Sequence, residues 1–219
     1  MNSRDLRLRA WGKLSGNWGG PIAVTLVYGL IIGLINGLSE VMPFIGLASI
    51  VVAGPLAVGI AGYFINFAKE RNPDFDGLFD GFKNSFGNSI VLSLLTGIFV
   101  LLWSLLFIIP GIIKAYAYSM AQYLMAENPN MTATEALDES QRLMQGHKMD
   151  LFILQLSFIG WALLCIVTLG IALIWVAPYV QAATAEFYLD ISGGNREVVD
   201  DEEKVIEVKN EDSFDAFLK

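Results

Sequence analysis

Two ionisable residues stand inside apolar stretches of this sequence, and they are the first candidates for chemistry. Lys114 comes four residues after Pro110, and Glu186 comes four residues before Asp190. An ionised group within a lipid bilayer is costly, so such residues merit a functional hypothesis. We expect Lys114 either to extend its amine to the lipid headgroups or to pair with Glu40. Glu186 is expected near the cytoplasmic surface, too far from Lys114 to pair with it.

Amide side chains in apolar stretches form a second set of candidates. They could line a polar pathway, but amides also join helices in lipid, which contributes about 0.6 to 2 kcal/mol each. The structural role is the expected one. With Glu40, Lys114 and Glu186, the candidate intramembrane polar positions are Gln122, Gln155 and Gln181.

The sequence contains no pattern of a known catalytic or metal site. There is no H-E-x-x-H, G-x-S-x-G, Walker loop or G-x-G-x-x-G. Cys165 and His147 are the only residues of their types, so an intrachain disulfide or a Cys/His metal cluster is excluded. We therefore expect no enzyme, no cofactor and no metal, although a set assembled from distant residues would leave no such pattern.

The composition is that of a membrane protein. Of 219 residues, 54% are hydrophobic and 16% are charged, against about 45–50% and about 25% in soluble domains. Residues 89–109 are uncharged, and these 21 residues match the ~20 that a helix needs to cross ~30 Å of hydrocarbon. The net charge of −8 leaves no basic stripe for nucleic acid.

The apolar stretches predict three helical hairpins. Proline cannot continue the helix hydrogen bonding and glycine favours turns, so the central pair is expected to fold back at Pro110-Gly111. The third pair is expected to turn near Thr168-Leu169-Gly170. The predicted fold is all-α: a polytopic bundle of about six transmembrane helices within residues 1–190, as hairpins at about 21–68, 89–128 and 151–190. Residues 41–68 are long enough for either one span or a re-entrant turn plus a span.

Small residues recur every fourth position in the first hairpin. Such stripes let two helices approach closely, so we expect the first two spans to pack through them. The stripes are Gly29, Gly33 and Gly37 in the first span, and Ala53, Ala57 and Ala61 in the second.

A short amphipathic helix is expected before each hairpin. The first, residues 3–15, is expected either to lie on the membrane surface or to pack on the bundle. The second should begin at Asn72-Pro73-Asp74. The third should open with a capping box of Thr132 and Glu135 and close at Gly146. Each helix ends at a glycine followed by a polar residue: Gly16-Asn17, Gly87-Asn88 and Gly146-His147.

Positive charge predicts the orientation of the bundle. Short loops rich in Lys and Arg stay in the cytoplasm, and these residues gather before the first span and between hairpins. Both termini are therefore expected in the cytoplasm, with the hairpins in the inner membrane. Residues 191–219 hold nine acidic and four basic side chains, and we expect a disordered tail there.

One run of residues resembles a known family. Residues 108–121 read IIPGIIKAYAYSMA and are followed by Glu127-Asn128-Pro129; Gly16-Asn17-Trp18 and residues 155–161 add to the likeness. Together they resemble the bacterial integral membrane family known as domain of unknown function 975, over about residues 4 to 191. This resemblance implies a multi-pass bacterial membrane protein and supplies no established activity. The acidic tail departs from the family pattern. More distantly, the hairpins are similar to the membrane part of some glycerophosphodiester phosphodiesterases.

These observations predict a protein without catalytic activity that organises or modulates lipids or partner membrane proteins. Its expected partners are the lipid bilayer, other membrane proteins or a second copy of itself. The alternative is a small transporter or channel for a solute or amphiphile, suggested by Lys114, the amides and the proline-interrupted spans.

Overall fold

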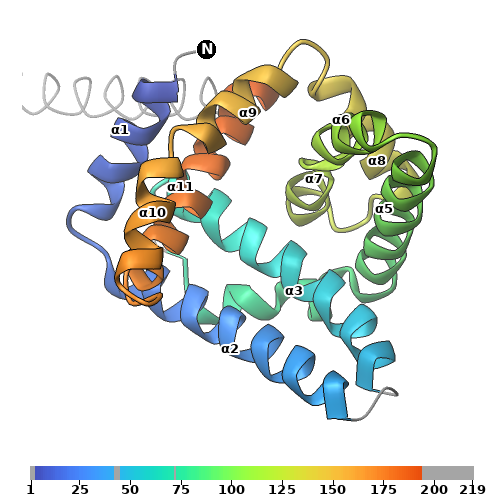
Figure 1. The fold of residues 1–219 in the computed structure, drawn as a ribbon, viewed down its shortest axis with the longest axis horizontal. Coiled ribbons are helices and arrows are strands. Elements are labelled where there is room, and N and C mark those ends of the chain that lie inside the picture. Colours follow the sequence, from blue (N-terminus) through green and yellow to red (C-terminus); the bar gives the residue numbers. More distant parts are fainter. Residues whose placement is uncertain (1–2, 42–44, 72, 194–219) are drawn as a thin grey trace, which may run out of the picture.

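The computed structural model describes residues 3–41, 45–71 and 73–193, with their side chains except those of residues 40, 41, 45–48, 50 and 106. All regular structure in these ranges is helical (Figure 1). The predicted tail lies outside the described residues beyond Gly193. The helices are α1 (Ser3–Leu14), α2 (Gly19–Val41), α3 (Ile45–Ala68), the 3₁₀ helix η1 (Phe75–Phe79), α4 (Asp80–Asn84), α5 (Phe86–Leu106), α6 (Ile108–Tyr118), α7 (Ala121–Glu127), α8 (Ala133–Leu143), α9 (Lys148–Leu156), α10 (Ile159–Val167) and α11 (Leu173–Ser192).

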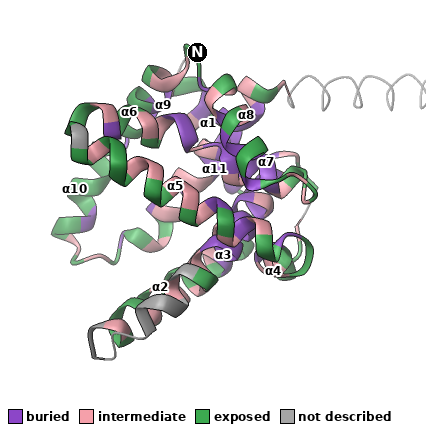
Figure 2. Cartoon of the chain, turned by 90° about the vertical axis from the view of Figure 1, so that its right-hand side faces the viewer, coloured by how far each residue is buried: buried purple, intermediate pink, exposed green. Residues whose placement is uncertain are grey.

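Four stretches within the described ranges are long and apolar enough to cross a bilayer, and they indicate a membrane protein. They are residues 19–39, 51–68, 86–105 and 148–167. The limbs formed by α6–α7 and by α11 are not among them, so the arrangement of six spans stays a prediction. In Figure 2, α6, α10 and the far ends of α2 and α3 lie on the left, whereas α4 and α7 lie on the right.

Helix α3 lies at the centre of the fold. It packs against α2, α5, α7 and α11, and also against η1 and α4. Gly59 makes the close contact with η1 possible, since a Cβ there would lie 1.9 Å from the Leu78 carbonyl oxygen. The helix continues through Pro55 without ending. One helix therefore covers Ile45 to Ala68, and the re-entrant alternative applies only to residues 42–44, which lie outside the described residues.

The glycine stripe of α2 does not receive another helix. Gly29, Gly33 and Gly37 are exposed, and a Cβ at any of them would have no neighbour within 4 Å. Helix α2 instead packs on the core through bulkier residues, among them Tyr28 and Ile31. The predicted glycine contact is wrong because the larger side chains offer more apolar area to bury.

The central hairpin turns before the predicted Pro-Gly pair. Phe107 has extended backbone angles (φ −157°, ψ 139°), and α6 begins at Ile108. Pro110 lies in the first turn of α6, where its missing N–H removes no helix bond. Gly111 lies against α5, since a Cβ there would be 2.0 Å from the Ser104 hydroxyl. The predicted turn at Pro110-Gly111 is corrected to Phe107.

Two of the helices predicted within the hairpins are interrupted. At each interruption, a side chain from another helix forms a hydrogen bond with the backbone. Between α6 and α7, the Ser140 hydroxyl donates to the Ala117 carbonyl (2.8 Å) and accepts from the Met120 amide (3.2 Å). Between α9 and α10, Arg7 donates to the Ser157 carbonyl (3.2 Å). Both donors come from residues distant in sequence, which is why continuous limbs were wrongly expected.

Only some of the predicted short helices form as expected. Helix α8 has the predicted capping box, with the Glu135 amide donating to Thr132 (3.3 Å) and the Thr132 amide donating to Glu135 (2.9 Å). The region after Asn72, itself outside the described residues, forms the short η1 and α4 instead of one helix. Gly87-Asn88 lies inside α5 and ends no helix, so the predicted three-fold pattern of helix endings is wrong there.

Helix α1 packs on the bundle, as in the second of the two alternatives. Its buried residues are Leu6, Ala10 and Leu14. They recur every fourth position and so share one face of the helix, which meets α11 and α9. This face brings the basic residues of α1 beside α11.

Candidate functional site

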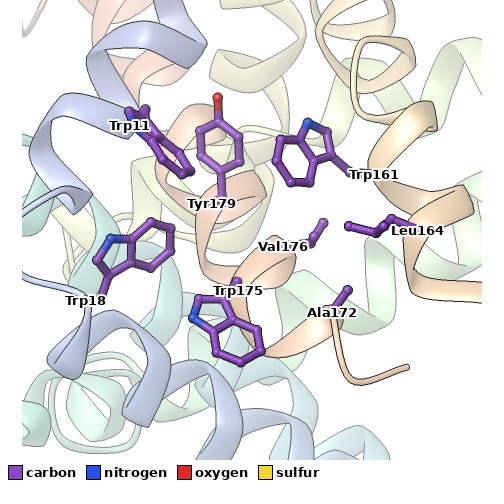
Figure 3. A pocket seen from close by; sticks show the side chains of 8 residues that line it. All are labelled: Trp11, Trp18, Trp161, Leu164, Ala172, Trp175, Val176 and Tyr179. Carbon is purple, nitrogen blue, oxygen red and sulfur yellow. The ribbon is translucent and has the colours of Figure 1, made fainter. Parts of the chain in front are cut away.

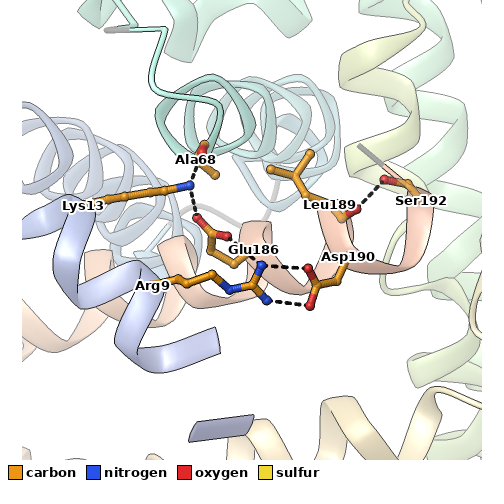
Figure 4. A network of polar contacts seen from close by, with 7 residues as sticks. All are labelled: Arg9, Lys13, Ala68, Glu186, Leu189, Asp190 and Ser192. Carbon is orange, nitrogen blue, oxygen red and sulfur yellow. Dashed lines mark hydrogen bonds and ion pairs between the residues drawn. The ribbon is translucent and has the colours of Figure 1, made fainter. Parts of the chain in front are cut away.

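The second half of α11 carries a group of ion pairs that we call the α11 polar cluster: Arg9, Lys13, Lys69, Glu127, Glu186, Tyr188 and Asp190. Glu186 is fully buried. Its carboxylate lies 2.7 Å from the Lys13 amine and 3.9 Å from Arg9 (Figure 4). Lys13 also donates a hydrogen bond to the Ala68 carbonyl at the end of α3. Because neither carboxylate oxygen has a directed hydrogen bond, opposite charge is what stabilises Glu186 there.

Arg9 also joins α1 to α11 through the carboxylate of Asp190. Its two terminal nitrogens donate to the two oxygens of Asp190, at 2.8 and 2.6 Å. Bidentate pairs of this kind fix orientation as well as charge. These hydrogen bonds raise the pKa of Arg9 above its ordinary value, so its guanidinium stays charged at any physiological pH.

The same cluster joins α3, α7 and α11. Lys69, just after α3, lies 2.5 Å from Glu127 at the end of α7. The Tyr188 hydroxyl donates to the other Glu127 oxygen at 2.6 Å, and the Tyr188 ring stacks on Tyr123 with centroids 5.4 Å apart. The charged groups of the cluster thus pair with one another and connect segments from all three predicted hairpins.

Lys114 has partners that neither expectation included. Its amine lies 2.7 Å from the Gln141 side-chain oxygen on α8. It also lies over the rings of Trp103 and Tyr118, at 5.4 and 5.6 Å from their centroids. The side chain of Glu40, the proposed partner, lies outside the described residues. Gln141 was missed because no local sequence pattern shows that α8 packs on α5 and α6.

The predicted amides are not brought together in one pathway. Gln155 accepts a hydrogen bond from the Tyr116 hydroxyl (2.7 Å) and so joins α9 to α6. Gln122 lines a cavity of about 420 Å³ bounded by α3, α5 and the α6–α7 limb. Gln181 lines a separate groove of about 670 Å³ between α2 and α11. Each amide belongs to a different place in the fold.

Four of the five tryptophans surround a single cavity, which we call the Trp pocket. Its volume is about 280 Å³, and its walls come from α1, α10, α11 and the residues just before α2 and α11 (Figure 3). Trp11 meets Trp18 edge to face at 5.5 Å and Tyr179 at 5.6 Å, an arrangement that suits aromatic rings. The lining residues are Trp11, Trp18, Trp161, Leu164, Ala172, Trp175, Val176 and Tyr179.

The Trp pocket is apolar inside and basic at one edge. The hydroxyl of Tyr179 donates to the Arg7 backbone carbonyl at 3.1 Å. The Arg7 guanidinium lies 6.0 Å from the centroid of Phe158, which itself meets Tyr179 edge to face. The sequence did not predict that these aromatic residues meet, because three distant segments supply them.

The family model described as "Protein of unknown function (DUF975)" matches residues 1–115 and 105–195. The chain belongs to the DUF975 family. The matched residues include every residue of the α11 polar cluster and of the Trp pocket, so both lie within the part of this DUF975 protein that the family model covers. No curated protein and no solved structure matched the chain.

No metal site is assigned in this DUF975 protein. Within the described ranges, no three His, Cys, Asp or Glu side chains are grouped as a metal ion would require. His147 lies 3.1 Å from Asp150 on the next turn, and Cys165 is buried.

Proposed function

We propose that this DUF975 protein is a multi-pass protein of the bacterial inner membrane that has no catalytic activity and organises or modulates membrane lipids. One observation carries the proposal: the outer face of α2 is a continuous stripe of exposed leucines. Such a stripe would be unfavourable in water and is favourable against lipid. The stripe consists of Leu26, Leu30, Leu34 and Leu38, which are 47–62% exposed.

The proposed topology is three hairpins with both termini in the cytoplasm. The far ends of α2 and α3 and the helices α6 and α10 lie on one side of the molecule (Figure 2). Arg9 and Lys13 of α1, together with Lys69, belong to the α11 polar cluster, which lies at the opposite end of α3. This segregation of charge supports the cytoplasmic assignment of that end.

The proposal of a non-catalytic role rests on how the polar groups are used. Glu186, Asp190 and Glu127 are held in ion pairs between helices, and Lys114 is bonded to Gln141. Groups engaged in this way connect helices and are poorly placed to act as acids, bases or nucleophiles.

A small transporter is the second candidate, and one cavity favours it. Ser93, Thr96, Ser119 and Gln122 line the cavity beside the interrupted α6–α7 limb. Interrupted helices next to polar side chains are found at the binding sites of secondary transporters. A flux assay in proteoliposomes separates the two functions.

The proposed function is tested by purifying the protein in native-lipid discs and comparing the copurified lipids with the whole membrane. We expect one lipid class to be enriched, and no saturable solute flux after reconstitution. Gln122→Leu serves as the matched variant for the cavity. Saturable flux that Gln122→Leu abolishes would establish the transporter and overturn the lipid role.

The topology is tested with alkaline phosphatase, which is active only outside the cytoplasm. We expect activity for fusions after Glu40 and after Leu169, and none after Asn128. Activity at Asn128 with none at Glu40 would reverse the orientation.

A further inference from the structure

We propose that the Trp pocket binds an acyl chain of an anionic phospholipid whose headgroup is held by Arg7. This inference rests on the proposed membrane function and deepens it by naming the lipid class and the site.

The lining of the pocket selects a hydrocarbon. Its walls are aromatic and aliphatic, and the surface that they present to the pocket is almost entirely apolar despite the indole N–H groups of the four tryptophans. The Tyr179 hydroxyl already donates to the Arg7 carbonyl. A polar ligand group would be desolvated there without a hydrogen bond, which is unfavourable. The part of the ligand inside the pocket is therefore apolar.

The position of the pocket selects a lipid as the source of that chain. Trp161, Trp175 and Leu164 are 38–51% exposed, so the pocket is open to the side. Leu163 and Ile166 of α10, the helix that supplies Leu164, are exposed as well, and α10 lies within the candidate span of residues 148–167. A chain in the surrounding bilayer can enter sideways without crossing water.

Arg7 selects a negative headgroup. It precedes Trp11 by one helical turn on the same face of α1. Of the five N–H groups of a guanidinium, one donates to Ser157, and Nε is buried without a partner. Arg9 and Lys13 are paired with acids, whereas Arg7 has no salt bridge in the described part of the chain. Its charge and spare donors suit a phosphate.

The spacing along α11 agrees with this placement. Glu186 follows Tyr179 by seven residues, or about 10 Å of helix. The ion-paired end of the helix and the apolar pocket are thus separated by a short distance along one axis, as are the headgroup and chains of a lipid.

A quaternary ammonium ion is the competing ligand, because cages of aromatic rings bind such cations. The Arg7 guanidinium lies over Phe158, whose ring meets Tyr179 of this cage. It would repel a cation, so we favour the anionic lipid.

Fluorescence quenching tests the inference, because four of the five tryptophans line the pocket and bromine quenches tryptophan on contact. The protein is placed in phosphatidylcholine discs that contain increasing fractions of phosphatidylglycerol with brominated chains. We expect quenching that saturates near one lipid per protein. Brominated phosphatidylcholine at the same fractions should give only a shallow, non-saturating decrease.

Two matched pairs of variants locate the site. Ala172→Phe fills the pocket and should abolish the saturable quenching, whereas Ala162→Phe, at an exposed position on α10, should retain it. Arg7→Gln should raise the half-saturating fraction about tenfold, the effect of losing a charged hydrogen bond. Arg142→Gln, on the exposed face of α8, should leave it unchanged.

Each result decides for or against the site. If Ala172→Phe does not fold, Leu164→Phe at the open edge of the pocket replaces it. Equal saturation by the two brominated lipids, or displacement by a hydrophobic quaternary ammonium ion, contradicts the anionic headgroup. Insertion into discs without any saturable quenching contradicts the pocket and leaves the membrane function standing. Failure to insert contradicts the proposed function itself.

Discussion

Helices α2 and α3 have similar mean hydropathy, 2.0 and 1.7 over their candidate spans, but 6% of the α2 span and 67% of the α3 span are buried. The two helices differ in the size of their side chains. Leucine recurs every fourth residue on the outer face of α2, whereas α3 has small residues where other elements approach. Hydropathy shows that a helix avoids water. Neither hydropathy nor side-chain size alone shows whether a helix is covered by protein, because the glycines of α2 lie on its exposed face whereas Gly54 and Gly59 of α3 lie against other elements.

The glycines of the two helices give the largest expected difference. In Gly59→Leu the new side chain would overlap the Leu78 carbonyl, from which even a Cβ is 1.9 Å away. We expect a loss of more than about 3 kcal/mol of unfolding free energy, because the backbone would have to move. Gly33→Leu, with nothing within 4 Å, should change stability by less than about 0.5 kcal/mol. Denaturation in detergent measures both, and equal losses would show that α2 has an unrecognised partner.

The ion pair between Lys13 and Glu186, near the end of α3, gives the next largest expected effect on stability. Lys13→Ala removes the amine that lies 2.7 Å from buried Glu186, and we expect a loss of about 3 kcal/mol. The double variant Lys13→Ala with Glu186→Gln should recover part of it. Lys83→Ala breaks an exposed pair with Asp76 and should cost at most about 1 kcal/mol. Thermal unfolding measures the stability of all three variants. If the double variant recovers no stability, the unpaired charge of Glu186 is not the reason for the loss in Lys13→Ala.

The interruption between α6 and α7 gives a smaller effect. Ser140→Ala leaves the buried Ala117 carbonyl and Met120 amide without this partner, so we expect a loss of about 1–3 kcal/mol. Amide hydrogen exchange of Met120 should rise as well. Ser15→Ala, which removes an exposed hydroxyl, is the control. Unchanged exchange at Met120 would mean that another group stabilises the interruption.

The capping box of α8 gives the smallest effect. Thr132→Ala should cost about 1 kcal/mol. The Thr132 amide and hydroxyl hold the pKa of Glu135 below its ordinary value. The stabilisation that Glu135 provides is therefore complete above that ordinary pKa and is lost as the pH falls through the lowered one. The free energy of unfolding, measured from pH 6 down to the acid limit, should therefore decline less in Thr132→Ala than in the unmodified protein. Parallel curves for the two proteins would show that Glu135 does not contribute in this way.

Local sequence patterns predicted some elements and failed for others. Two predicted features depend only on neighbouring residues: the capping box at Thr132 and the turn at Leu169-Gly170. Leu169 and Gly170 both have positive φ, as such a turn requires. The interruptions near Met120 and Ser157 depend on Ser140 and Arg7 from other helices. No local pattern contains that information, and continuous limbs were expected instead.

The candidate site was predicted only in part. Glu186 was singled out because a carboxylate in an apolar stretch is unusual, but its partner Lys13 is known only from the packing of α1 on α11. The Trp pocket was not predicted, because residues such as Trp11 and Trp175 become neighbours only when distant segments meet. Single residues could be ranked by chemistry, whereas their partners required the fold.

The contrast between exposed α2 and protein-covered α3 is tested most directly by spin labels on a Cys165→Ala background in a bilayer. A label at Leu30, which is 62% exposed, should collide with oxygen and be shielded from a water-soluble nickel complex. A label at Asp138, exposed on α8, should show the reverse. Equal access of the nickel complex to both positions would contradict the account, because α2 would then face water.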